Sequence, residues 1–516
     1  MGATLARCGA VVQADVMRLS FLSLLLLGGC TTLGPNFTAP GWSGPGAWSG
    51  GGKPPAPVSE TVEAPIDPNW WTLFKDPTLT GLEQRVANEN LDLSIAALRI
   101  EQSRAQYDQA RAAGLPTVDA NASYTRQKAS NVGVFANAPN ALGASGISGG
   151  TAGGLGSARL NSFDVFQAGF DASWELDLWG KIRRSVEAAK ATTVVSEETR
   201  RGVLLSDLAE VARDYITLRG VQTELRIARD NVGIAQDSLK LTRQRAEGGV
   251  TTNLDVSNAA AQLSTTLARI PALEQQEAQL INALSLLLGL PPNGLRAELA
   301  TPRAVPPVPP LVPIGLPSEL ARRRPDVRQA EAQLHVATAN IGVATAEFYP
   351  SLTLSGSAGL QSIQFASLFG MNARQFAIGP TLSVPLFEGG RLKATLHLTE
   401  AQQKEAAVSY QQTVLRALHE VDNALTAYRS EQVRRKQLID AVAENRRALE
   451  LARARYAQGV ADFLTVLDTQ RTLLSNELLL ADSTTTVSAN LVVLYKALGG
   501  GWETDLPDAP KQVARQ

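Results

Sequence analysis

Two similar stretches determine the fold: RAEGGVTTNLDV at residues 245–256 and RYAQGVADFLTVLD at residues 455–468. Each follows a long segment that is predicted to be helical. In each stretch a glycine, Gly249 or Gly459, can adopt the left-handed conformation that stops a helix. Thr251 and Asp462 then have side chains suited to starting a returning helix. The spacing predicts two helical hairpins, one in each half of the chain.

The segments that lead into these turns are too long for an ordinary globular domain. Residues 180–248 contain no proline, and residues 391–458 contain neither glycine nor proline. At about 1.5 Å per residue, each segment can form a helix of roughly 100 Å. Apolar or small residues recur along the second half at heptad-like steps, at Val414, Leu418, Val421, Leu425, Tyr428, Val460, Leu464, Leu467, Leu474, Leu478 and Ala481. Such spacing is typical of a coiled coil or a helical tube.

The two halves of the chain are an internal repeat. Matching features keep a constant offset of 210 residues, as from Gly249 to Gly459. Upstream the offset becomes 234, because the first half carries an extra loop at 129–161. We therefore divide the chain into a first repeat at 69–300, a proline-rich linker at 301–317, a second repeat at 318–500 and a tail at 501–516. In each repeat the predicted elements, in chain order, are a helix, a strand, a loop, a strand, a very long helix, a tight turn and a helix.

Four segments alternate strictly between apolar and polar residues, which predicts β-strands with one apolar face. Their apolar positions are Val118, Ala120, Ala122 and Tyr124; Phe166, Ala168, Phe170, Ala172, Trp174, Leu176 and Leu178; Leu352, Leu354, Ala358 and Leu360; Phe376, Ile378, Leu382, Val384 and Leu386. Each segment has about the length of a tilted strand that crosses a bilayer. The alternative is the edge of a soluble β-sandwich. The fold class is mixed α+β, and an isolated coiled-coil rod would leave these strands unexplained.

A membrane location for the strands requires an oligomer. Four strands cannot close a barrel, and an open strand edge is not tolerated in lipid. Two chains would supply 8 strands and three chains 12, of which only the larger set leaves a wide lumen.

The N-terminus has the parts of an export signal. A basic start at Met17-Arg18 precedes a short apolar run at 19–27, which is too short to span a bilayer. Leu27-Gly28-Gly29-Cys30 resembles the bacterial lipobox, in which the cysteine is lipidated and becomes the first residue. We therefore interpret 1–29 as a lipoprotein signal peptide, with Met17 a possible true start, and 30–68 as a lipid-anchored extended tether. An ordinary signal peptide or a short buried helix is the alternative.

Composition excludes several function classes. The 48 Lys and Arg balance 49 Asp and Glu, so the chain is not a globally basic nucleic-acid binder. Three His and two Cys give no basis for a metal centre or a disulfide framework. No P-loop, G-x-S-x-G or H-E-x-x-H motif is present. We expect no enzymatic activity and no cofactor apart from the lipid on Cys30, so that a partner must supply the energy.

Several motifs, in their order along the chain, resemble the outer membrane factors of bacterial export systems, of the TolC and OprM type and especially their lipoprotein branch. Besides the lipobox they are WWTLFKDPTLTGL (70–82), RRPDVRQAE (323–331), AEFYPSLTLSG (346–356), PLFEGGR (385–391) and RYAQGV…LTVLDTQR (455–471). The resemblance implies a homotrimer whose 12 strands form one outer-membrane β-barrel, continuous with a long periplasmic α-helical barrel. It also implies a periplasmic adaptor and an inner-membrane pump of the RND type as partners.

The resemblance also places functional residues. The periplasmic tip would be closed by Val460, Leu464 and Asp468, on one helical face at steps of four. A Leu464 ring would be an apolar constriction, and an Asp468 ring would attract cations. Ordinary interhelical packing for Leu464 and a solvated carboxylate for Asp468 are the alternatives. The adaptor would dock on Gly249, Val250, Gly459 and Val460.

In the RRPD motif, Pro325 suits the first turn of a helix and Asp326 its positive end, and we expect Arg323 and Arg324 to pair with acids.

Together these features predict the exit duct of a tripartite efflux system for small molecules, gated at its helical tips and located in the outer membrane. A duct for secreted polypeptides, as in type I secretion, and a periplasmic scaffold lipoprotein without a channel are the alternatives.

Overall fold

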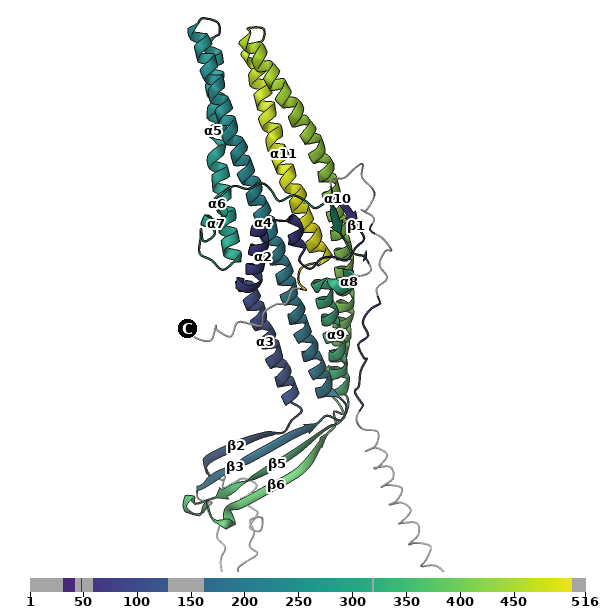
Figure 1. Ribbon diagram of the computed structural model, residues 1–516. Coiled ribbons are helices and arrows are strands. Elements are labelled where there is room, and N and C mark those ends of the chain that lie inside the picture. Colours follow the sequence, from purple (N-terminus) through teal and green to yellow (C-terminus); the bar gives the residue numbers. More distant parts are fainter. Residues whose placement is uncertain (1–30, 42–47, 49–58, 129–161, 318–319, 504–516) are drawn as a thin grey trace, which may run out of the picture. The chain divides into compact units, whose positions relative to one another are not determined.

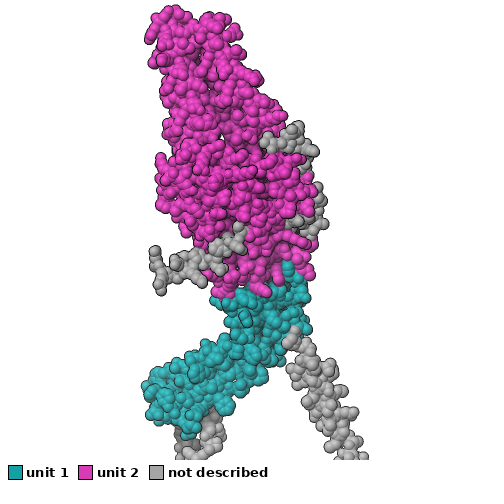
Figure 2. Space-filling view, in the orientation of Figure 1, with its two compact units in different colours: residues 1–37, 106–189, 337–402 teal, residues 38–105, 190–336, 403–516 magenta. Residues whose placement is uncertain are grey.

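The computed structural model describes residues 31–41, 48, 59–128, 162–317 and 320–503. The chain divides into two compact units, residues 1–37, 106–189 and 337–402 in the first and 38–105, 190–336 and 403–516 in the second (Figure 2). The elements in chain order are β1 (Glu60–Val62), η2 (Trp70–Phe74), α2 (Pro77–Glu89), α3 (Leu91–Ala112), β2 (Thr117–Gln127), β3 (Phe163–Leu176), α4 (Lys181–Glu247), α5 (Asn253–Leu267), α6 (Arg269–Leu287), α7 (Arg296–Leu299), β4 (Leu311–Pro313), α8 (Leu320–Arg323), α9 (Pro325–Ala346), β5 (Ser351–Ser362), η5 (Phe365–Ser367), η6 (Met371–Ala373), β6 (Arg374–Ser383), α10 (Arg391–Ala457) and α11 (Phe463–Leu498).

The first unit holds a four-stranded antiparallel sheet in the order β2-β3-β5-β6 (Figure 1). These are the four alternating segments predicted from the sequence, although β3 ends at Leu176 and β6 at Ser383, slightly earlier than expected. The large apolar side chains of β6 are exposed, with Phe376 at 84 % and Ile378 at 75 %, whereas those of β5 are partly buried. The expected half-buried face is therefore an uncovered apolar face in the single chain.

The two long helices are present as predicted, since α4 and α10 each contain 67 residues. Their returning partners differ from one another. The second hairpin returns as one helix, α11, whereas the first is interrupted at Ala268 between α5 and α6. Pro271 explains the interruption, because it has no N–H to donate to the carbonyl of Leu267 four residues earlier.

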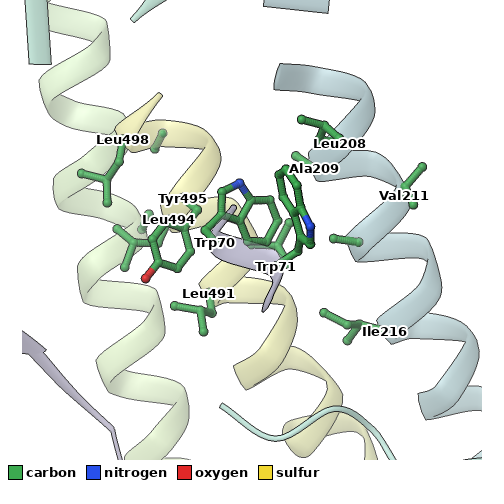
Figure 3. Packing of buried hydrophobic residues seen from close by; sticks show 14 of the residues in the cluster. Trp70, Trp71, Leu208, Ala209, Val211, Ile216, Leu491, Leu494, Tyr495 and Leu498 are labelled. Carbon is green, nitrogen blue, oxygen red and sulfur yellow. The ribbon is translucent and has the colours of Figure 1, made fainter. Parts of the chain in front are cut away.

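The core of the second unit gathers around the tryptophan pair of η2 (Figure 3). Trp70 is fully buried and stacks on Tyr495 of α11 with ring centroids 5.3 Å apart. Its Nε1–H donates to the carbonyl of Gly500 at 3.2 Å, so the indole is satisfied as well as buried. Trp71 packs on the other side, next to α4. The motif at 70–74 therefore joins α4 to α11.

Two segments that we predicted to be irregular meet in a small sheet. Strand β1 lies in the expected tether and β4 in the proline-rich linker, and they pair in parallel with Thr61 opposite Val312. Val312 is fully buried. The linker therefore packs against the chain, because the backbone N–H and C=O groups of β1 and β4 pair with one another.

The RRPD motif has the structural role predicted for it. Helix α9 begins at Pro325, and the buried Arg324 donates from Nη2 to both Asp326 and Glu420 at 2.7 Å. Its Nη1 donates to the carbonyl of Ala497 at 2.8 Å, and Arg323 pairs with Glu503 at 2.7 Å. The motif thereby fixes the end of α11.

Some predictions concern other parts of the chain. The signal peptide, Cys30 and the extra loop at 129–161 lie outside the described residues, as does most of the tail. Among the described helices, α11 is long and apolar enough to cross a membrane, but half of its most apolar stretch is buried within the protein. Its composition is explained by the core.

Candidate functional site

The two helical hairpins of the second unit end in turns with the same backbone geometry, at the same end of that unit (Figure 1). Gly249 and Gly459 have φ angles of 71° and 79°, the left-handed conformation predicted for both. The N–H of Val250 donates to the carbonyl of Arg245 at 2.8 Å, and Val460 donates in the same way to Arg455 at 2.9 Å. These bonds satisfy carbonyls that the helix ends leave open.

The returning helices start one residue away from our prediction in one hairpin and as predicted in the other. Thr252, and not Thr251, caps α5, in a reciprocal capping box with Asp255. Asp462 caps α11 and accepts hydrogen bonds from the backbone and hydroxyl of Thr465 at 3.1 and 2.6 Å. The bonds from Thr465 lower the pKa of Asp462, so this cap stays ionised.

The proposed gate residues lie on the exposed side of the second tip. Leu464 is 61 % exposed, and Asp468 follows it one turn later on the same exposed face of α11. Val460 is also exposed but lies in the turn before α11 begins, so the expectation of three residues on one helical face is wrong for Val460. The opposite face of α11, with Phe463, Val466 and Leu467, is buried against the rest of the tip.

The four proposed docking residues are all at the surface. Val250 and Val460 have nearly equal exposures of 66 % and 65 %, and the two glycines beside them are exposed as well. The tips therefore present two similar small apolar surfaces. The position of these residues at the two turns was predicted from the repeat, and their part in docking stays a prediction.

An arginine that we did not single out as functional connects the two tips. Arg245, in the last turn of α4, donates from Nη1 to the carbonyl of Tyr456 at 2.5 Å. Its guanidinium also lies 4.5 Å from the centroid of the Tyr456 ring. A cation at the C-terminal end of α10 is favourable because the last carbonyls carry partial negative charge. The repeat marked Arg245, but only the structure shows its partner.

A cavity of about 750 Å³ opens between the two hairpins, below the tips, and is lined by α4, α10, α11 and the linker. The carboxylate of Glu477 lines this cavity and accepts hydrogen bonds from Arg446 at 2.8 Å and from Asn231 at 3.2 Å. Further from the tips, Asp207 of α4 is 8 % exposed, and burial together with the nearby Asp92 and Glu210 raises its pKa to about 7. Within the described residues no group of three or more His, Cys, Asp or Glu side chains is arranged to hold a metal ion.

The sequence that forms the two hairpins and the sheet matches a known family. Residues 82–290 and 316–500 match the family described as outer membrane efflux protein. The chain belongs to the outer membrane efflux protein family. The resemblance expected from the sequence motifs is thereby confirmed, as are the outer-membrane location and the role in efflux.

Individual relatives cover nearly the whole chain. The antibiotic efflux pump outer membrane protein ArpC of Pseudomonas putida is 34 % identical over 505 residues, which is 96 % of this chain and 99 % of the relative. The probable outer membrane lipoprotein SilC of Salmonella typhimurium is 31 % identical, over 94 % of this chain and 98 % of its own. The solved structure of the outer-membrane channel OprN is 33 % identical, with a TM-score of 0.80 over 91 % of this chain and 99 % of that structure.

Proposed function

We propose that three copies of this chain form one gated exit duct of a tripartite efflux system. The four-stranded sheet carries this proposal. In the described residues β2 pairs only with β3 and β6 only with β5, so both outer edges of an exposed apolar sheet are unpaired. Lipid tolerates such a sheet only when its edges are closed by further strands, and twelve strands leave room for a lumen. The long helices would then form the periplasmic barrel.

We propose further that the tips close the duct at rest. Three Leu464 side chains around the threefold axis would form an apolar constriction, and three Asp468 carboxylates next to it would attract cations. Both residues are exposed in the single chain, which supports this proposal. The Leu464 side chain is not packed into the core of its own chain and is therefore available to contact its copies.

The gate is tested by single-channel conductance in a planar bilayer, with wild type beside Leu464→Ser/Asp468→Ala. We expect a small wild-type conductance that rises severalfold in the double variant. Leu254→Ser, at the equivalent exposed position of the first tip, is a matched control and should change conductance less. Unchanged conductance in the double variant would refute the gate, and no conductance from inserted protein would favour the scaffold alternative.

The partners we propose are a periplasmic adaptor on the tips and an inner-membrane pump of the RND type, with small molecules such as antibiotics as cargo. The name of ArpC as part of an antibiotic efflux pump supports this cargo class over secreted polypeptides. We also propose that Cys30 carries a covalent lipid, which the lipobox and the lipoprotein name of SilC support. Mass spectrometry of the mature N-terminus tests the lipid.

A substitution at the second tip tests adaptor docking. Gly459→Trp should reduce export while the amount of protein in the membrane stays the same. Since the positive φ of Gly459 makes any side chain there strained, Val460→Arg serves as a second variant that leaves the glycine turn intact. Gly233→Trp, at an exposed helical glycine with open space around it, is the control. Normal export by both tip variants would contradict docking at this tip.

A further inference from the structure

The internal repeat makes the ends of α4 and α10 equivalent residue by residue. Arg245 corresponds to Arg455, and the pair Ala246-Glu247 corresponds to Tyr456-Ala457. The backbones agree as well, since Gly249 and Gly459 each donate a 3.0 Å hydrogen bond, to the carbonyls of Ala246 and Tyr456 respectively. A contact made by one helix end can therefore be made by the other.

Within the chain only one of these two contacts is formed. Arg245 reaches the end of α10, where its Nη1 lies 2.5 Å from the carbonyl oxygen of Tyr456 and 3.4 Å from that of Ala457. Arg455 is exposed, and none of the hydrogen bonds or ion pairs found among the described residues involves its side chain. The reverse contact, from Arg455 to the end of α4, is not formed inside one chain.

We propose that Arg455 of one copy caps the end of α4 in the next copy, at the carbonyls of Ala246 and Glu247. This inference rests on the proposed duct of three chains. In a ring of six hairpins, three junctions lie within chains and three lie between them. A head-to-tail ring built from an internal repeat uses related contacts at both kinds of junction.

Charge complementarity at the end of α4 supports this partner. Ala246 stands where the within-chain contact has Tyr456, so the junction between copies has no aromatic ring for the guanidinium. Glu247 stands where the within-chain contact has Ala457, the second residue reached by Arg245. Glu247 is exposed, and no ion pair among the described residues includes it. Its carboxylate supplies an anion for Arg455 in place of the ring.

Cysteine crosslinking tests the contact. Arg455→Cys/Glu247→Cys, treated in detergent with a bifunctional maleimide whose reach replaces the length of the arginine side chain, should migrate as two- and three-chain species on a denaturing gel. The matched pair Arg245→Cys/Ala457→Cys joins residues of one chain and should keep the mass of one chain. Single-cysteine variants measure the background of crosslinks that need only one introduced thiol.

Two negative results are distinguishable. Only single-chain species from the first pair, in a sample whose mass by light scattering is that of three chains, would overturn the contact and leave the duct standing. A mass of one chain would overturn both the duct and the contact that rests on it.

Charge exchange gives an independent test with a functional readout. Arg455→Glu and Glu247→Arg should each raise the resting conductance severalfold, because like charges then face one another across the junction. The double exchange should return conductance toward the wild-type value. A double variant that is as leaky as the two single variants combined would contradict the pairing.

Discussion

At the residue scale, a single buried arginine holds the first described segment of the chain. Arg184 of α4 is 3 % exposed and donates to the carbonyls of Leu33 and Gly34 at 3.0 and 3.2 Å and to Asn36 Oδ1 at 2.7 Å. A Cβ added to Gly34 would lie 2.5 Å from the Cα of Gly342 in α9, so the two backbones are too close for a side chain at Gly34. The segment behind Cys30 is therefore docked on the first unit, because a planar guanidinium matches several acceptors at once.

Substitution of Arg184 should free this segment. Arg184→Lys keeps the charge but loses the several N–H donors of the guanidinium. The backbone amide of Leu33 donates a hydrogen bond to the carbonyl of Trp179 at 3.1 Å. We expect this amide to exchange its hydrogen about tenfold faster or more in the variant. Arg183→Met, at the partly exposed neighbouring position, should leave the exchange rate unchanged. The measurement is hydrogen exchange by mass spectrometry over residues 31–37.

If the membrane alone held the segment, Cys30→Ser would accelerate exchange and Arg184→Lys would not. That outcome would contradict the clamp. We expect the reverse, with protection retained in Cys30→Ser.

At the element scale, β3 and β5 lie close together where one glycine of each strand faces the other. Gly169 lies opposite Gly359, and a Cβ on Gly359 would meet the carbonyl oxygen of Ala168 at 2.7 Å and the Cα of Gly169 at 2.8 Å. The alternation pattern predicted these strands, but it did not show that their pairing requires two glycines. The atoms that a Cβ would meet belong to the backbone, which cannot move aside to make room for a side chain.

Gly359→Val should therefore weaken the sheet by about 1–3 kcal/mol, the usual cost of forcing extra volume into close packing. We expect the oligomer band on a denaturing gel to disappear at a lower temperature. Gly356→Val, on the same inner strand β5 but with its nearest neighbours 3.9 Å from an added Cβ, should melt close to wild type. Equal melting of the two variants would mean that β3 and β5 are not so tightly joined.

At the scale of the whole molecule, the exposed apolar face of the sheet requires a cover. Phe376, Ile378 and Leu382 are 84 %, 75 % and 63 % exposed, although the chain as a whole has a mean hydropathy of only −0.05. Large contiguous apolar surfaces are covered by lipid or by other protein.

We therefore expect the purified protein to precipitate when detergent is removed and to have the mass of three chains in detergent. Light scattering with correction for bound detergent measures both. Replacement of Phe376 and Ile378 by glutamine should reduce insertion into vesicles without changing helix content by circular dichroism. A stable detergent-free monomer would be evidence for the soluble-sandwich alternative.

The long helices, the two glycine turns and the strands could be predicted from the sequence, because each depends on local preferences or on a fixed period. Proline-free runs, left-handed glycines and strict alternation act within a few residues. The repeat also identified the tips as corresponding sites. These features were sufficient to recognise the family, which the comparisons then confirmed.

Contacts between residues far apart in the sequence could be identified only in the folded chain. Arg245 reaching Tyr456, Arg184 holding Leu33, and β1 pairing with β4 join positions that are far apart in sequence. A guanidinium can pair with any exposed carbonyl, so no local pattern selects its partner. The selection is made by the packing of the long helices and by the path of the segments that lie against them, and that packing depends on the whole chain.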